Sequence, residues 1–208
     1  MLPLLAILPN ITDLFTDANA TVTQLMAAHG YLAVFGLMLV EGASLPVPSE
    51  IVLPLAGYFA AKGTMNVFLA FVFALLGSTG GLIIDYTIGY VIGKDIVYKH
   101  LERFHVKKSS LDAFDTWFAR NGVAAVFFSR LIPVLRTLMS FPAGFAKMPL
   151  KKFFLYSITG SVIWDSVLIA FGYYLLSAKS AEIVMAAIGV FAIVMYVVFK
   201  LAMKRIRH

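Results

Sequence analysis

The first long apolar region of this chain is interrupted by prolines, so that neither half is long enough to cross a bilayer. Residues 31–40 and 51–61 are apolar, and Pro46 and Pro48 stand between them. A transmembrane helix needs about 20 consecutive apolar residues. Two short halves around a proline-rich break therefore predict a re-entrant helical hairpin, which enters the membrane and returns to the same side. Irregular backbone at that depth persists only where it is buried in protein or lines a cavity.

The composition places the chain in a membrane. Of its 208 residues, 61% are hydrophobic and only 13% are charged, and the mean hydropathy is +0.88, far outside the range of soluble domains. Cysteine is absent, which excludes disulfides, Cys-ligated metals and redox thiols. The net charge of +6 could suggest a nucleic-acid partner, but the basic residues are scattered between apolar runs. That distribution is typical of a topology signal and indicates no nucleic-acid surface.

The pattern of the first half recurs in the second. Residues 67–93 are long enough to span; later, residues 123–141 are broken by Pro133 and Pro142, and a second span follows over 153–176. Short identical pairs recur at nearly constant spacing in the two copies: Pro46-Val47 and Pro133-Val134, Ala56-Gly57 and Ala143-Gly144, Gly77-Ser78 and Gly160-Ser161, Gly89-Tyr90 and Gly172-Tyr173. This is an internal duplication. A hairpin plus one span makes an odd number of crossings, so the second copy is predicted to be inverted.

Charge predicts the orientation. On the predicted topology the basic residues are divided unequally between the two membrane faces, and one face carries only Lys62 and Lys179. Most of the 17 basic residues fall on the other face: Lys94, Lys99, Arg103, Lys107, Lys108, Arg120, Lys147, Lys151, Lys152, Lys200, Lys204, Arg205 and Arg207. By the positive-inside rule this basic face, with the C-terminus, is cytoplasmic in a multi-pass plasma-membrane protein.

The predicted fold is an all-α integral membrane protein, an inverted repeat of a re-entrant helical hairpin plus a transmembrane helix, with an extra C-terminal transmembrane helix. We expect an N-terminal interfacial, amphipathic segment, a duplicated domain, and a C-terminal transmembrane helix with a basic tail, over residues 1–29, 30–178 and 179–208. The domain divides into repeat 1, a cytoplasmic linker and repeat 2, over about 30–94, 95–120 and 121–178.

Two arginines, Arg130 and Arg136, remain inside the apolar part. Each charge there costs about 2.5–3.5 kcal/mol on insertion scales, so it predicts a functional site. Pro133 lies midway, and a break there could place the two arginines on facing arms of a hairpin tip. A guanidinium matches phosphate geometry with paired donors. Arg130 and Arg136, with the adjacent hydroxyls of Ser129 and Thr137, are therefore candidate ligands of a phosphate headgroup.

Four acids complete the candidate site. Glu41 and Glu50 straddle the first tip, where a carboxylate in apolar surroundings could take up and release protons, and we expect them to act in proton coupling or gating. The alternative is a plain salt-bridge lock between these acids and the two arginines. Asp85 and Asp165, one on each predicted span, are secondary candidates, with a helix-packing hydrogen bond as the alternative.

Catalysis is not expected. The histidines, His29, His100, His105 and His208, all lie outside the apolar segments, so neither a Ser-His hydrolase nor a His-ligated metal site can be assembled in the membrane. The small-residue run at 77–81 has no nucleotide-binding spacing and indicates close helix packing. We therefore predict no metal, no cofactor and no enzymatic activity.

Several motifs together resemble the DedA family, also called the SNARE-associated or VTT-domain family, over about residues 30–178. They are Glu41, the run from Pro46 to Gly57, Gly77-Ser78-Thr79, Phe128 to Pro133 with Arg136-Thr137, and Ala143-Gly144 with Met148. Two departures are Pro48-Ser49-Glu50, where some members have Pro-Gly-Asp or Pro-Gly-Glu, and Tyr90, where many have a basic residue.

The resemblance implies two opposed re-entrant hairpins, each followed by a transmembrane helix. It also implies recycling of undecaprenyl phosphate or movement of phospholipids such as phosphatidylethanolamine across bacterial membranes, often with proton dependence. The functional positions of the family fall here on Glu41, Glu50, Arg130 and Arg136.

The leading hypothesis is a lipid transporter or flippase that moves an anionic, phosphate-bearing lipid, with a polyprenyl phosphate first and a phospholipid second. Expected partners are membrane lipids and protons but no nucleic acid, and the oligomeric state is left open. One alternative is a proton-coupled transporter of ions or small solutes in which the arginines are structural. Another is a membrane scaffold without transport.

Overall fold

The computed structural model describes residues 11–45, 47–103, 108–133 and 135–176, and no strand occurs in these ranges. An all-α fold was predicted and is confirmed for them; the predicted C-terminal span lies outside the described residues. The helices are α1 (Ile11–His29), α2 (Tyr31–Gly42), α3 (Ser49–Ala61), α4 (Val67–Arg103), α5 (Lys108–Ser129), α6 (Leu135–Leu138), α7 (Ser140–Phe145), α8 (Leu150–Phe171) and the π-helical segment η1 (Gly172–Leu176).

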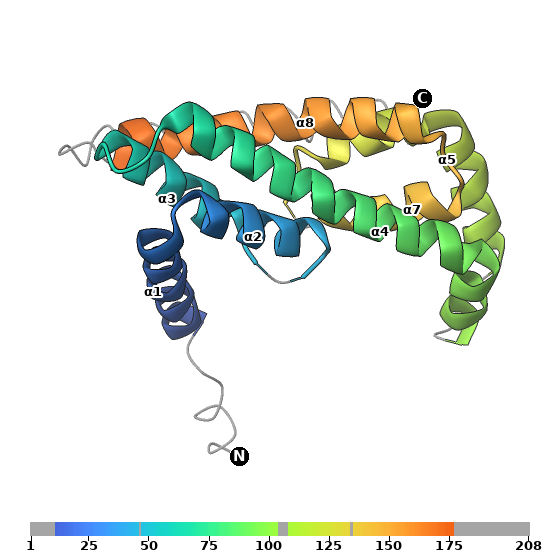
Figure 1. The fold of residues 1–208 in the computed structure, drawn as a ribbon. Coiled ribbons are helices and arrows are strands. Elements are labelled where there is room, and N and C mark those ends of the chain that lie inside the picture. The colour runs from blue at the N-terminus through green and yellow to red at the C-terminus, as the bar shows by residue number, and fades with distance from the viewer. Residues whose placement is uncertain (1–10, 46, 104–107, 134, 177–208) are drawn as a thin grey trace, which may run out of the picture.

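Two long helices, α4 and α8, run lengthwise and antiparallel through the molecule (Figure 1). Their apolar parts, Val67–Gly93 and Leu150–Tyr174, contain 27 and 25 residues. At 1.5 Å per residue these lengths are about 40 and 37 Å, which exceeds the roughly 30 Å hydrocarbon core of a bilayer. They are the candidate membrane spans, at the positions the sequence predicts. Gly93, with a φ of 71°, interrupts α4 where its apolar part ends.

The hairpin of α2 and α3 has both outer ends beside the start of α4. The backbone N–H of Asn66 donates a hydrogen bond of 2.6 Å to the hydroxyl of Tyr31, the first residue of α2. At its other end, α2 reaches the middle of the apolar part of α4, where Gly42 packs on Ser78 and Gly81. The α2–α3 turn is thereby positioned about halfway along the spans.

Small residues let α2 and α4 approach closely. A Cβ on Gly77 would lie 2.3 Å from the carbonyl oxygen of Phe35, and one on Gly81 would lie 2.5 Å from that of Leu39. Both distances are far below van der Waals contact, so only glycine fits. The predicted packing role of the 77–81 run is confirmed.

The two hairpins pack on opposite long helices in the same manner. A Cβ on Gly57 of α3 would lie 2.1 Å from the carbonyl oxygen of Ile169 on α8, and one on Gly144 of α7 would lie 2.2 Å from that of Tyr86 on α4. Gly57 and Gly144 occupy matching positions of the two sequence copies, as do Tyr86 and Ile169. Helix α3, from the first sequence copy, therefore contacts α8 of the second copy, and α7, from the second copy, contacts α4 of the first.

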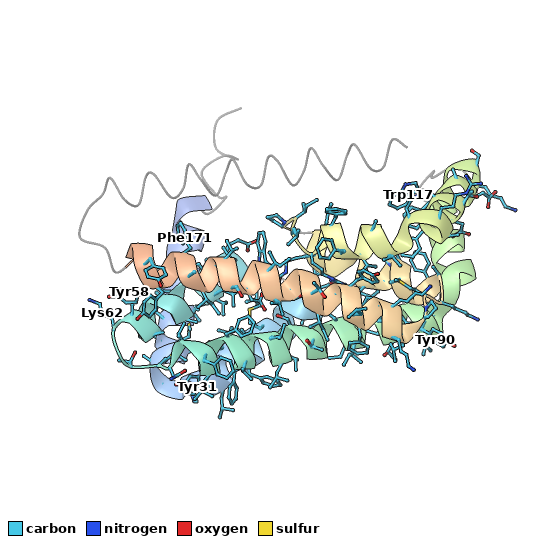
Figure 2. All side chains as sticks on the ribbon, turned by 90° about the horizontal axis from the view of Figure 1, so that it is seen from above. Tyr31, Tyr58, Lys62, Tyr90, Trp117 and Phe171 are labelled. Atoms are coloured by element: carbon cyan, nitrogen blue, oxygen red, sulfur yellow. The ribbon has the colours of Figure 1, made fainter. Side chains whose placement is uncertain are left out.

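The remaining helices, α1 and α5, lie at opposite ends (Figure 1). Helix α1 contacts α2 and α3, with Val22 and Met26 buried in the core that they share. Helix α5 packs along α8. In Figure 2, Lys62 lies at one end of the molecule, and Tyr90 and Trp117 lie at the other end, with α5.

Candidate functional site

Arg130 and Arg136 flank the turn between α5 and α6, and both side chains are buried, with 1% and 4% of their surfaces exposed. The turn begins where α5 ends at Ser129. There the backbone hydrogen bonds span three residues in place of the four of an α-helix, as in the Arg130 N–H that donates to the carbonyl of Phe127. This break in the helix directs the two guanidinium groups to different sets of partners.

Arg136 is held by three other helices. Its Nε lies 3.2 Å from Oε1 of Glu41 on α2, and its Nη2 donates to Oε2 of the same carboxylate at 3.3 Å. Its Nη1 donates to the hydroxyl of Ser49 on α3 at 3.3 Å. On α8, Oδ1 of Asp165 lies 3.7 Å from Nη2, within ion-pair distance but too long for a hydrogen bond, and the Trp164 ring centroid lies 5.5 Å from the guanidinium carbon. Arg136 is thus a charge-compensated centre.

Arg130 has hydroxyl partners in place of carboxylates. Its Nη2 donates to Ser140 on α7 at 3.1 Å and to Ser157 on α8 at 3.0 Å, and its guanidinium carbon lies 5.6 Å from the centroid of the Phe153 ring. Its Nε and Nη1 are buried without a hydrogen-bond partner. No carboxylate in the described part of the chain lies within ion-pair distance of it.

The difference between the two arginines has a chemical consequence. A buried donor without a partner costs about 1–3 kcal/mol, and a buried charge without a counter-charge costs several kcal/mol more. The fold offsets this cost at Arg136 and retains it at Arg130. A phosphate or carboxylate with two oxygens supplies what Nε and Nη1 of Arg130 lack, a paired acceptor that carries negative charge.

The remaining predicted site residues are Glu50, expected in proton coupling or gating, and the expected phosphate ligands Ser129 and Thr137. Glu50 is exposed in the first turn of α3; its Oε2 lies 3.5 Å from the hydroxyl of Ser49 and is not within ion-pair distance of either arginine. The Ser129 hydroxyl donates to the carbonyl of Val126 in its own helix at 2.8 Å. Thr137 is half-buried on α6. The structure therefore brings Glu41, but not Glu50, to the arginines.

The two secondary acids differ from each other. Asp85 on α4 is buried and accepts a hydrogen bond from the hydroxyl of Ser44, which ties the α2–α3 turn to α4. This is the helix-packing hydrogen bond that stood as the alternative for Asp85. Asp165 is also buried, but neither of its carboxylate oxygens has a hydrogen-bond partner, and it faces Arg136.

The sequence arguments did not select Ser49, Ser140, Ser157 or Trp164 as site residues. One signal was present: Ser157, Ser161 and Asp165 are spaced four residues apart, so they form one polar face of an apolar helix, and all three are buried. No periodicity marks Ser140, because its approach to Arg130 arises only from the turn that separates α5 from α7.

Comparison with known proteins gives a consistent result. The sequence model of the VTT domain matches residues 47–174. The chain is 35% identical over 185 residues to undecaprenyl phosphate transporter A of Staphylococcus aureus, covering 87% of this chain and 90% of that protein. It is 31% identical over 156 residues to an alkaline phosphatase-like protein of Lactococcus lactis, covering 73% of each. It is 24% identical over 172 residues to protein DedA of Escherichia coli, covering 79% of this chain and 78% of that protein. No solved structure matches.

Proposed function

This chain belongs to the VTT-domain family, to which protein DedA also belongs, and on that premise we propose that it moves a polyprenyl phosphate, such as undecaprenyl phosphate, across the plasma membrane. The observation that carries the proposal is Arg130, a buried guanidinium with two unpartnered nitrogens and no carboxylate partner among the residues that the structure describes. A phosphate monoester has the charge and the paired oxygens that this group lacks. The name of the Staphylococcus aureus relative supports the choice of lipid.

The proposal includes an inverted repeat of re-entrant hairpins. Helices α2 and α3, with 12 and 13 residues, are too short to span, and the start of α2 and the end of α3 lie at one end of α4. The matching close approaches of Gly57 to α8 and of Gly144 to α4 support a two-fold relation between the copies. The hairpin tips would then meet near the membrane midplane, where repeat-built transporters hold their substrates.

In this proposal Arg136 and Glu41 form the closed contact between the two tips. Arg130 is only 1% exposed, so a phosphate reaches it only after α5, α7 or α8 moves. A proton that neutralises Glu41 removes the charge that pairs with Arg136, and it therefore weakens the contact that keeps the tips together. Proton coupling through Glu41 follows from this arrangement as part of the proposal.

A purely structural lock is the rival explanation, and the Arg136–Glu41 pair fits it equally well. Arg130 distinguishes the two, because a lock has no use for a buried charge that lacks a counter-charge. Two relatives from Lactococcus lactis are named alkaline phosphatase-like protein, and these names identify no catalytic residue in this chain. Among the described side chains, no group of three or more His, Asp or Glu could hold a metal ion.

The test is translocation of labelled polyprenyl phosphate and labelled phosphatidylethanolamine in proteoliposomes. We expect the polyprenyl phosphate to cross faster than in empty liposomes and Arg130→Ala to remove the difference. The control is Lys62→Gln, which removes an exposed charge at the far end of the molecule and is expected to leave transport unchanged (Figure 2). If neither lipid moves faster than in empty liposomes, the proposed function is wrong.

A further inference from the structure

A cavity of about 740 Å³ lies where α5 meets the turn between α7 and α8. Tyr90 and Trp117 mark this end of the molecule (Figure 2). This cavity is distinct from the buried arginine site, because its lining includes none of Arg130, Arg136 and Glu41.

The lining of this cavity is basic. Arg120 comes from α5, and Lys147 and Lys152 come from the α7–α8 turn and the start of α8. Among the lining residues that the structure describes, Asp115 is the one acid. All three cations are exposed at the rim of this open cavity, and three cations against one described carboxylate leave a positive excess, which favours an anion.

The position of Lys147 is fixed by its backbone. Its φ of 52° lies in the left-handed region, which a side chain other than glycine adopts rarely. Its ammonium lies 5.8 Å from the centroid of the Tyr90 ring on α4. This conformation closes the end of α7, where the N–H of Lys147 donates to the carbonyl of Gly144 at 2.8 Å and the N–H of Met148 donates to that of Ala143 at 3.0 Å.

An apolar groove of about 470 Å³ adjoins the cavity between α5 and α8. Val123 lines both spaces. In the groove, Ala124 and Phe127 on α5 face Leu155 and Tyr156 on α8, so its walls are almost entirely hydrocarbon. The basic cavity and the apolar groove therefore adjoin at Val123, along the same helix.

Helix α5 continues from this groove toward the buried site. Arg120, Val123, Phe127 and Arg130 follow one another at spacings of three and four residues, which places them along one face. At 1.5 Å per residue, Arg120 and Arg130 are about 15 Å apart along the helix. The face thus has a cation at each end and hydrocarbon between them.

We propose that the cavity and the groove together bind one anionic lipid, with its phosphate among Arg120, Lys147 and Lys152 and its hydrocarbon chain between α5 and α8. The inference rests on the proposed lipid transport and adds to it a headgroup site that is separate from Arg130. A lysine or arginine at a membrane surface needs no ligand, because its charged end reaches water. Three cations that line one cavity continuous with an apolar groove match both parts of a phosphate-bearing lipid.

The absence of cysteine from this chain permits a direct test by thiol protection. Ala119 lines the cavity, Ala124 lines the groove, and Ala113 is an exposed alanine on α5 that lines neither. Each is changed to cysteine singly, in detergent-solubilised full-length protein, and the rate of maleimide labelling is measured. The added ligands are polyprenyl phosphate, the uncharged polyprenol and inorganic phosphate.

With polyprenyl phosphate at ten times its dissociation constant, we expect labelling of Ala119→Cys and Ala124→Cys to slow by about tenfold, since about nine-tenths of the sites are then occupied. Labelling of Ala113→Cys is expected not to change. Polyprenol should leave Ala119→Cys unprotected. If inorganic phosphate protects Ala119→Cys as well as the lipid does, and Ala124→Cys is not protected, the site binds free phosphate and the lipid assignment is wrong. Equal protection of Ala113→Cys would mean non-specific partition and would also overturn it.

The charge requirement is tested with neighbouring lysines. Both lysines are exposed, but Lys152 lines the cavity and Lys151 does not. Lys152→Gln should raise the lipid concentration needed for protection of Ala119→Cys by about tenfold, the change that one phosphate contact of about 1.4 kcal/mol gives. Lys151→Gln should not raise it, and equal effects of the two changes would contradict the proposed headgroup contact.

The labelling assay requires no transport, so the two proposals fail separately. Protection without any translocation in proteoliposomes leaves this lipid site standing and refutes the proposed transport. Translocation without protection of Ala119→Cys and Ala124→Cys refutes the lipid site and leaves the proposed transport standing.

Discussion

Arg136 joins the two halves of the chain through Glu41, whose carboxylate oxygens lie 3.2 and 3.3 Å from Nε and Nη2 of the guanidinium. Glu41 ends the first arm of the first hairpin, and Arg136 lies just past the break in the second. Arg130, at the other side of the same break, donates hydrogen bonds to the hydroxyls of Ser140 and Ser157 and has no carboxylate within ion-pair distance among the described residues. One arginine is therefore suited to hold the halves together, and the other to receive an anion.

Arg130→Lys should lower polyprenyl phosphate transport by about tenfold or more, although it conserves the charge. A lysine ammonium is a point charge and cannot contact Ser140 and Ser157 while presenting a second pair of donors to phosphate. The measurement is the initial rate of translocation in proteoliposomes, with elution as a single folded species as the control. Full activity of a folded Arg130→Lys protein would contradict the phosphate role and favour a scaffold.

The pair of Glu41 and Arg136 should show strong coupling in a double-mutant cycle. Arg136→Gln leaves the buried Glu41 without its counter-charge, and Glu41→Gln leaves Arg136 with only the more distant Asp165. Breaking a buried pair costs about 3–5 kcal/mol, and the double change leaves neither Glu41 nor Arg136 as an unpaired charge. We therefore expect the double variant to be destabilised by clearly less than the sum of the single changes, as measured by denaturant unfolding in detergent. Additive effects would show that the pair is not coupled.

The exposed Glu50 supplies the matched control for that cycle. It lies within ion-pair distance of neither arginine, so Glu50→Gln should change the free energy of unfolding by less than about 0.5 kcal/mol.

The response of transport to a pH gradient should depend on Glu41 and not on Glu50. Protonation of Glu41 changes the charge at a buried contact between the two hairpins, while Glu50 is exposed. In proteoliposomes with an imposed gradient, Glu41→Gln should remove the acceleration and Glu50→Gln should keep it. Loss of acceleration in Glu50→Gln alone would assign proton coupling to Glu50.

Gly57→Ala and Gly144→Ala should each destabilise the protein by about 1–3 kcal/mol or more, because the added methyl meets a carbonyl oxygen of a facing helix at 2.1 or 2.2 Å. Gly36→Ala is the control, since nothing lies within 4 Å of a Cβ at that helical position. It should be neutral or stabilise α2 by up to about 1 kcal/mol. Thermal unfolding of the three variants measures the difference, and equal shifts would show that the hairpins do not pack closely on α4 and α8.

Hydropathy and duplication were enough to locate the helices. The two spans fall where uninterrupted apolar runs exceed the thickness of a bilayer, and the breaks at Pro48 and Pro133 are where they were predicted. The predicted break at Pro142 is wrong, because Pro142 lies in the first turn of α7, where a missing N–H costs no helical hydrogen bond. The glycine run at 77–81 was likewise readable, since small residues in an apolar helix permit close approach. Arg130, Arg136 and Glu41 were found because a charge in an apolar run is conspicuous.

The residues that contact these charged side chains could not be predicted from the sequence. Glu41 and Glu50 were predicted to lie together at the site, but Glu50 is exposed. Asp165 was predicted only as a secondary candidate, and it faces Arg136. Glu50 follows Ser49 directly in the first turn of α3, so the two side chains point about 100° apart around the helix. Ser49 contacts Arg136, and Glu50 therefore does not.

The sequence by itself determined that the chain is a helical membrane protein, where its apolar helices and breaks lie, and that two arginines remain in the apolar part. Those properties follow from the free-energy cost of placing polar groups in hydrocarbon. That cost depends on the type of residue and not on its tertiary partners. Only the tertiary structure decided that Arg136 is paired and Arg130 is not, and that Arg120, Lys147 and Lys152 line one cavity. These relations join residues far apart in the chain, and the angles at which α2, α3, α5, α7 and α8 meet fix which side chains touch.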